Sequence, residues 1–170
     1  MPHINVDGLW FEFPDRWTAS KYDDWVFYRN QWTKMRSGVK SVDILAVDPE
    51  RTGWLIEVKD YSKHPRTKPS DLAQEIADKV FDTLAAMLPV RVNATDDTEK
   101  FVASPMARAM NLRVVLHLEQ PVVLSRLRPH VINPADIRQR LKQLLKPVDP
   151  HPAVTAMAQM AALPWQVARS

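Results

Sequence analysis

Three charged residues interrupt two segments that otherwise read as buried β-strands. Residues 42–48 and 54–61 are rich in valine, isoleucine, leucine and aromatic residues, a composition typical of strands. The stretch DPERTG between them has the proline and glycine of a tight turn. Charged side chains inside such a hairpin are costly unless they pair or bind a ligand. Asp43, Glu57 and Lys59 therefore constrain this chain more than any other feature.

The spacing predicts that these three side chains converge. Successive side chains of a strand point to opposite faces, so Glu57 and Lys59 point the same way. Folding back at the turn brings Asp43 to the level of Glu57. Two carboxylates at that place repel each other, and they are typical of a site for a hard divalent cation such as Mg²⁺. The lysine then lies where an ammonium group orients water or stabilises negative charge on a phosphate.

The pattern D-x13-E-x-K across a hairpin resembles the PD-(D/E)xK phosphodiesterase superfamily, which includes restriction enzymes, junction resolvases and repair exonucleases. Asp43 matches the metal-binding aspartate of that motif, and Glu57 with Lys59 matches its ExK half. Val42 stands where the family has a proline. The resemblance implies an α/β fold with a restriction-endonuclease-like core, in which a mixed β-sheet with a central hairpin is flanked by helices.

The same resemblance implies an activity and a metal site. The activity is a nuclease reaction, in which metal-activated water hydrolyses phosphodiester bonds of DNA in preference to RNA. The implied cofactor is Mg²⁺ (or Mn²⁺), held by Asp43, Glu57 and the Val58 carbonyl. The alternative is a non-catalytic nuclease-fold module that binds nucleic acid or protein as a subunit of a larger assembly.

Members of the superfamily also use residues from neighbouring helices. Some carry an acidic residue from the first helix into the metal site; Asp23 and Asp24 occupy that segment here, and Asp24 is retained as the accessory candidate. Others place a glutamine from the helix after the hairpin near the site, where this chain has Gln74. A solvated helix surface is the competing explanation for all of these residues.

Basic residues cluster in two places that suit a nucleic-acid backbone. The first is the loop directly after the ExK strand, which contains Lys63, His64, Arg66 and Lys68. The second is a stretch that contains Arg126, Arg128, His130, Arg138, Arg140, Lys142 and Lys146. From the second stretch we select Arg138 as the nucleic-acid-binding candidate. An ordinary solvated loop and a solvated helix face are the alternatives.

The remaining patterns predict the elements around the hairpin. Strands are expected over residues 9–13 and 111–119, and residues 91–110 read as a loop with one helical turn. Helices are expected over residues 19–35, 71–88, 134–146 and 153–163. The helix at 71–88 would be capped by Ser70 and ended by Pro89, and the one at 134–146 would be capped by Asn133. The superfamily usually has one more strand before the aspartate, and it has no clear place here unless residues 9–13 supply it.

Composition bounds the remaining possibilities. The 170 residues fit a nuclease-like α/β domain over 1–146, followed by a proline-rich linker and short C-terminal helix over 147–170. A net charge of +3 permits nucleic-acid binding, and the absence of cysteine excludes disulfides and thiolate metal sites. Five histidines without HxH or HxxxH spacing disfavour another metal hydrolase. No apolar run spans a bilayer, so we expect a cytoplasmic protein with no membrane partner, as a homodimer or part of a larger complex.

Overall fold

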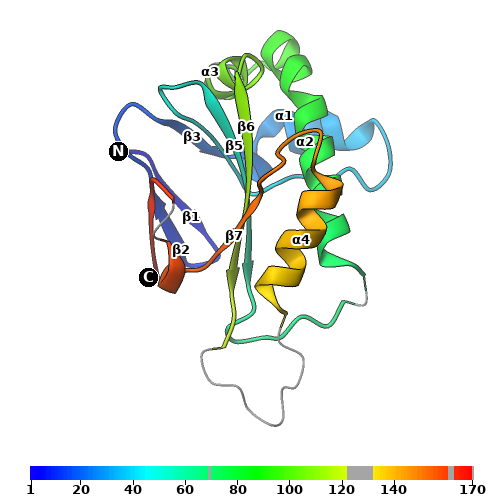
Figure 1. The fold of residues 1–170 in the computed structure, drawn as a ribbon. Coiled ribbons are helices and arrows are strands. Elements are labelled where there is room, and N and C mark those ends of the chain that lie inside the picture. Colours follow the sequence, from blue (N-terminus) through cyan, green and yellow to red (C-terminus); the bar gives the residue numbers. More distant parts are fainter. Residues whose placement is uncertain (69, 122–131, 161–162, 170) are drawn as a thin grey trace.

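The computed structural model describes residues 1–68, 70–121, 132–160 and 163–169 as a mixed α/β protein with two sheets (Figure 1). The predicted α/β class is confirmed at this level. The larger sheet has the strand order β3 (Thr18–Lys21), β4 (Ile44–Val47), β5 (Thr52–Asp60), β6 (Asn111–Glu119) and β7 (Ala153–Thr155). The smaller, antiparallel sheet has the order β1 (His3–Val6), β2 (Leu9–Glu12) and β8 (Gln166–Arg169).

The predicted hairpin is confirmed, with β4 and β5 antiparallel and Ile44 opposite Ile56. Asp48 closes the turn, because its Oδ1 accepts a hydrogen bond of 2.8 Å from the Thr52 N–H and its carbonyl accepts one of 3.0 Å from the Arg51 N–H. The strand predicted over residues 111–119 is also confirmed, since β6 pairs in parallel with the whole of β5. The hairpin and β6 thus form the centre of the larger sheet.

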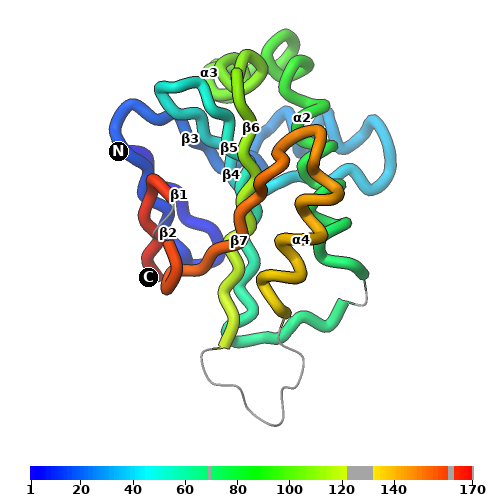
Figure 2. The backbone as a smooth tube through the Cα atoms, viewed as in Figure 1, coloured from blue at the N-terminus to red at the C-terminus, as the bar shows by residue number. Residues whose placement is uncertain are grey.

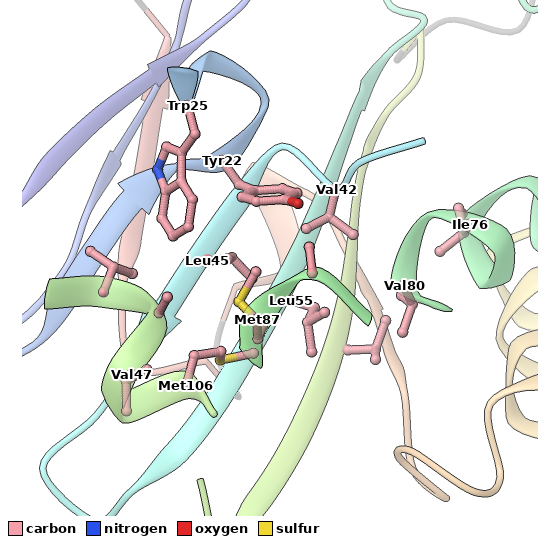
Figure 3. Close-up of a cluster of buried hydrophobic side chains, with 14 of the residues drawn as sticks. Tyr22, Trp25, Val42, Leu45, Val47, Leu55, Ile76, Val80, Met87 and Met106 are labelled. Carbon is pink, nitrogen blue, oxygen red and sulfur yellow. The ribbon is translucent and has the colours of Figure 1, made fainter. Parts of the chain in front are cut away.

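The two faces of the larger sheet bury two separate cores. Figure 3 shows the helix side, where Leu45 and Leu55 pack with side chains from the helices, among them Val80 and Met87. The opposite face packs Ile56 and its neighbours against the smaller sheet. Side chains alternate along β5, so residues 55, 57 and 59 share the helix side. The charged pair of β5 is therefore covered by helices.

The helix after the hairpin is longer than predicted. α2 spans Leu72–Asn93, with Pro89 inside it, and Asp71 rather than Ser70 caps its N-terminus by accepting from the Ala73 and Gln74 N–H groups. Proline removes one hydrogen bond and normally ends or kinks a helix. Here buried side chains lie on both sides of it, Met87 and Val90, so packing carries the helix past the expected end.

The loop predicted over residues 91–110 is wrong, because α3 spans Asp97–Met106. The acidic stretch that read as a loop is a helix start: Asp96 accepts from the Thr98 and Glu99 N–H groups. Buried Glu99 in turn accepts from the N–H groups of Val26, at 2.5 Å, and Phe27. Asp96 and Glu99 therefore cap two helices, α3 and α1.

The helix predicted over residues 19–35 is also wrong. Residues 18–21 form β3, which pairs with β4 and supplies the additional strand before the aspartate; residues 9–12 belong to the smaller sheet instead. Only short helical pieces follow: the 3-10 turns Tyr22–Asp24 and Trp32–Lys34, with α1 (Val26–Asn30) between them. Pairing with β4 outweighs the helical spacing of the aromatic residues.

The C-terminal part joins both sheets (Figure 2). α4 spans Pro134–Leu144 with Asn133 as its cap, as predicted. The helix predicted over residues 153–163 is wrong: β7 extends the larger sheet, the 3-10 turn Met157–Gln159 follows, and β8 completes the smaller sheet. Among the described helices, none is long and apolar enough to cross a membrane.

Candidate catalytic and metal site

The hairpin register brings the two predicted carboxylates together. Asp43 comes directly before β4, and because Ile44 pairs with Ile56, the next position of the ladder sets Asp43 opposite Glu57. The Asp43 Oδ2 accepts a hydrogen bond of 2.7 Å from the Val58 N–H. This bond holds the Asp43 carboxylate over β5, on the level that the spacing predicted.

Glu57 is fully buried and only half paired. Its Oε1 accepts from the Lys59 Nζ at 2.7 Å and from the Lys79 Nζ at 2.5 Å. Its Oε2 is buried and has no hydrogen-bond partner among the described residues. A buried carboxylate oxygen without a partner is unfavourable, which marks Oε2 as an atom available to a ligand.

The surroundings shift the pKa values of Glu57 and Lys59. Burial, and then the neighbouring Asp43 carboxylate, raise the pKa of Glu57 from 4.5 to about 7, against the opposing effect of the two lysines. Burial on its own would lower the pKa of Lys59, but the Glu57 carboxylate outweighs it and the pKa is raised. Shifted pKa values of this kind are frequent at functional sites and occur also in structural ion-pair networks.

Sequence reasoning missed Lys79, which α2 places on the same oxygen as Lys59. A signal was present. Lys79 follows Leu72 and Ile76 at helical spacing and precedes Thr83, and all three of these neighbours are buried. A lysine on the inward stripe of an amphipathic helix indicates a buried anionic partner.

The accessory candidates Asp24 and Gln74 make no hydrogen bond or ion pair with Asp43 or Glu57 among the described residues. Asp24 is exposed and pairs with Arg29 and with Lys21, the latter at 3.4 Å. Gln74 is exposed and donates to the Asp78 Oδ1 at 2.9 Å. The neighbouring Asp23 is directed inward: burial raises its pKa, with Asp43 adding to the effect, and its Oδ1 is buried without a partner among the described residues.

The basic loop after β5 is partly engaged within the protein. Arg66 donates to the Glu75 Oε2 at 3.2 Å and to the Tyr61 hydroxyl at 3.1 Å. Lys63, His64 and Lys68 are exposed, although Lys68 also lies 3.9 Å from Glu75. Three of the four residues predicted to contact a nucleic-acid backbone are thus exposed to solvent, next to the end of β5. Of the second basic stretch, Arg126, Arg128 and His130 lie outside the described residues.

His117 belongs to the opposite face of the sheet. It is fully buried, its Nε2 lies 2.8 Å from the Glu119 Oε1, and its ring packs edge-on against Phe11. Burial lowers its pKa. This histidine therefore belongs to the core between the two sheets. It takes no part in the group formed by Asp43, Glu57, Lys59 and Lys79, which we call the Asp43 cluster.

The donor set suits a hard cation. Asp43 and Glu57 supply carboxylate oxygens, the Val58 carbonyl is adjacent in sequence, and the Glu57 Oε2 has no hydrogen-bond partner in the described part of the chain. Within the described part of the chain, no three or more histidine, aspartate or glutamate side chains form a metal-binding group. Mg²⁺ is commonly bound through one or two carboxylates, with substrate phosphates and water completing its shell.

Comparisons with known proteins give one informative likeness. No family model matches the chain, and no solved structure matches it significantly. Among curated proteins, it is 30% identical over 176 residues to a cysteine--tRNA ligase from Neisseria meningitidis serogroup A / serotype 4A (strain DSM 15465 / Z2491). The match covers 86% of this chain and 25% of the ligase, so the chain spans about a quarter of the length of that relative.

Proposed function

We propose that this chain is a metal-dependent nuclease with a restriction-endonuclease-like core. One observation carries the proposal: Asp43, directly before β4, stands opposite Glu57 of β5. Lys59 contacts the Glu57 carboxylate, and one buried Glu57 oxygen has no hydrogen-bond partner among the described residues. The order of elements supports it. Three antiparallel strands, a long helix and a parallel fourth strand surround the site, in agreement with the hairpin-centred mixed sheet that the resemblance implies.

Asp43, Glu57 and the Val58 carbonyl would hold Mg²⁺ (or Mn²⁺). When bound, such a cation supplies an acidified water as nucleophile and neutralises charge on the phosphate. Lys59 orients that water or stabilises the negative charge on the scissile phosphate. Lys79 contacts the same Glu57 oxygen, so it continues to balance the carboxylate when Lys59 turns towards the substrate.

The substrate is DNA in preference to RNA. Lys63, His64 and Lys68 are exposed directly after the strand that carries Lys59, where they meet backbone phosphates. Contacts of this kind release counterions, so binding weakens steeply as salt is added.

Asp43→Asn tests this proposal, because asparagine keeps the size and the acceptor for the Val58 N–H but removes the charge. Wild type is expected to cleave at least one of four substrates, which are circular duplex, linear duplex, single-stranded DNA and RNA, in Mn²⁺ and not in EDTA. The variant should be at least about 100-fold slower, because a ligand charge is lost. The matched control is Asp24→Asn, whose carboxylate is exposed and paired with Arg29, and it should retain the wild-type rate. Equal rates for Asp43→Asn and wild type, or no cleavage of any substrate, would contradict the proposal.

A non-catalytic module is the second candidate, and the lysine pair favours it. Lys59 and Lys79 already balance the Glu57 charge without a cation, and the Asp43 carboxylate already has a partner in the Val58 N–H. Such a module would bind nucleic acid or protein, and its binding would be independent of Mn²⁺ and of Asp43.

A further inference from the structure

A cavity of about 370 Å³ lies between α4 and β7, away from the Asp43 cluster. Its polar lining is basic and neutral, and none of the described residues that line it is acidic. The side chains that matter for its chemistry are Arg113, Arg138, Lys142, His151, Thr155 and Gln159. A cavity with this lining attracts an anion.

Arg113 is held in place in the cavity wall. Its Nε lies 3.3 Å from the Asp149 Oδ2, its Nη2 donates to the His151 carbonyl at 3.2 Å, and its guanidinium lies 5.7 Å from the centre of the Trp54 ring. Asp149 is buried and also accepts from the Val114 and His151 N–H groups. The guanidinium is thus oriented before any ligand arrives, which lowers the entropic cost of binding.

Arg138 and Lys142 supply the unpaired charge. They are one helical turn apart on the same face of α4, and both are exposed. Neither has an ion-pair or hydrogen-bond partner among the described residues, whereas Arg140, on another face of the helix, lies 3.5 Å from Asp71. Like charges four residues apart destabilise a helix. Two such cations beside a cavity without acids therefore indicate an anionic ligand.

We propose that this cavity holds a backbone phosphate of a nucleic acid, at a distance from the scissile bond. A second cavity of about 600 Å³ shares Arg113 and His151 with it, and the one acidic residue among its described lining residues is Asp149, which is paired with Arg113. The site therefore continues into a neighbouring space and suits a chain-like ligand better than a single ion. The assignment rests on the proposed function for the kind of polymer, which is DNA. The basic lining itself is independent of metal and of cleavage.

The test is binding of short fluorescent single-stranded and duplex DNA in EDTA, followed by anisotropy at several salt concentrations. The double variant Arg138→Gln/Lys142→Gln should bind DNA at least about tenfold more weakly than wild type at low salt. The slope of its log K against log salt concentration should be smaller in magnitude by about one to two. The matched control, Lys34→Gln/Arg91→Gln, removes the same charge from two exposed residues that line neither cavity, and should bind like wild type. Thermal unfolding confirms that both proteins are folded.

Two outcomes would overturn the proposal: no binding of DNA by wild type, or equal losses of affinity in the two double variants. A wild type that binds inorganic phosphate but no DNA would have a site for free phosphate instead. Because EDTA is present, the failures are separable. If the protein never cleaves DNA but shows the expected binding, the anion site is supported and the proposed nuclease function is contradicted. If it cleaves DNA but binds equally with and without Arg138 and Lys142, the nuclease function is supported and the anion site is contradicted.

Discussion

Replacing Lys59 with alanine is expected to slow metal-dependent phosphodiester cleavage by about 10²- to 10⁴-fold. The Lys59 side chain is 19% exposed and lies 2.7 Å from Glu57, so its ammonium is held beside the carboxylate pair while one side remains open to substrate. Removing it takes away the group that orients water or stabilises charge on the phosphate. Lys79 remains on Glu57 and preserves the charge balance. Initial rates on the best substrate in Mn²⁺ measure the effect.

The control for this variant is Lys63→Ala, which removes an exposed lysine four residues further along the chain. It should weaken substrate binding modestly and in a salt-dependent way, without the large loss of rate. Thermal unfolding of both variants shows whether either change has disrupted the fold. Cleavage by Lys59→Ala at the wild-type rate would remove Lys59 from the proposed mechanism.

Glu57→Gln is expected to change how stability depends on pH in the metal-free protein. A raised carboxyl pKa means that the folded state holds the proton more tightly than the unfolded chain. The contribution of Glu57 protonation to the free energy of unfolding is fully present below pH 4.5, and it is lost as the pH rises through about 7. Each pH unit between the two pKa values corresponds to about 1.4 kcal/mol, so the loss amounts to about 3 kcal/mol at full burial. Urea unfolding in EDTA, followed by tryptophan fluorescence, measures the wild type and the variant from pH 5 to 8.

The expected result is a difference in the free energy of unfolding, wild type minus Glu57→Gln, that falls by up to about 3 kcal/mol as the pH rises over this range. Glu75→Gln is the control, because ion pairing with Arg66 and neighbouring lysines outweighs burial and lowers the pKa of Glu75. The contribution of Glu75 is lost only below pH 4.5, so its difference from wild type should be flat between pH 5 and 8. A flat difference for Glu57→Gln as well would mean that Glu57 is ionised in the fold throughout.

The hairpin and its charged residues were predictable because the pattern is local and strong. Two apolar runs and a turn with proline and glycine predict the hairpin. The two-residue period of side chains along a strand then determines which residues share a face. The same holds for α4, where Asn133 and Pro134 are a helix start that depends on no distant contact. Asp43, Glu57 and Lys59 could therefore be proposed as a group from spacing alone.

The rest depends on contacts between distant segments. The strand at residues 18–21 forms because β4 offers an edge, which no local pattern reveals. α3 begins at a polar stretch whose Glu99 is buried by capping α1, 72 and 73 residues away in sequence. Lys79 reaches Glu57 only through the packing of α2. The functional neighbourhood of a site is thus harder to predict than its central motif.

Mn²⁺ binding, measured by titration calorimetry, tests most directly the claim that Asp43 and Glu57 hold one cation between them. Wild type is expected to bind a single Mn²⁺ per chain at millimolar affinity or better, Asp43→Asn and Glu57→Gln should each bind at least about tenfold more weakly, and Asp24→Asn should bind like wild type. The absence of Mn²⁺ binding by wild type, or unchanged binding by Asp43→Asn, would contradict the shared metal site and favour the non-catalytic module.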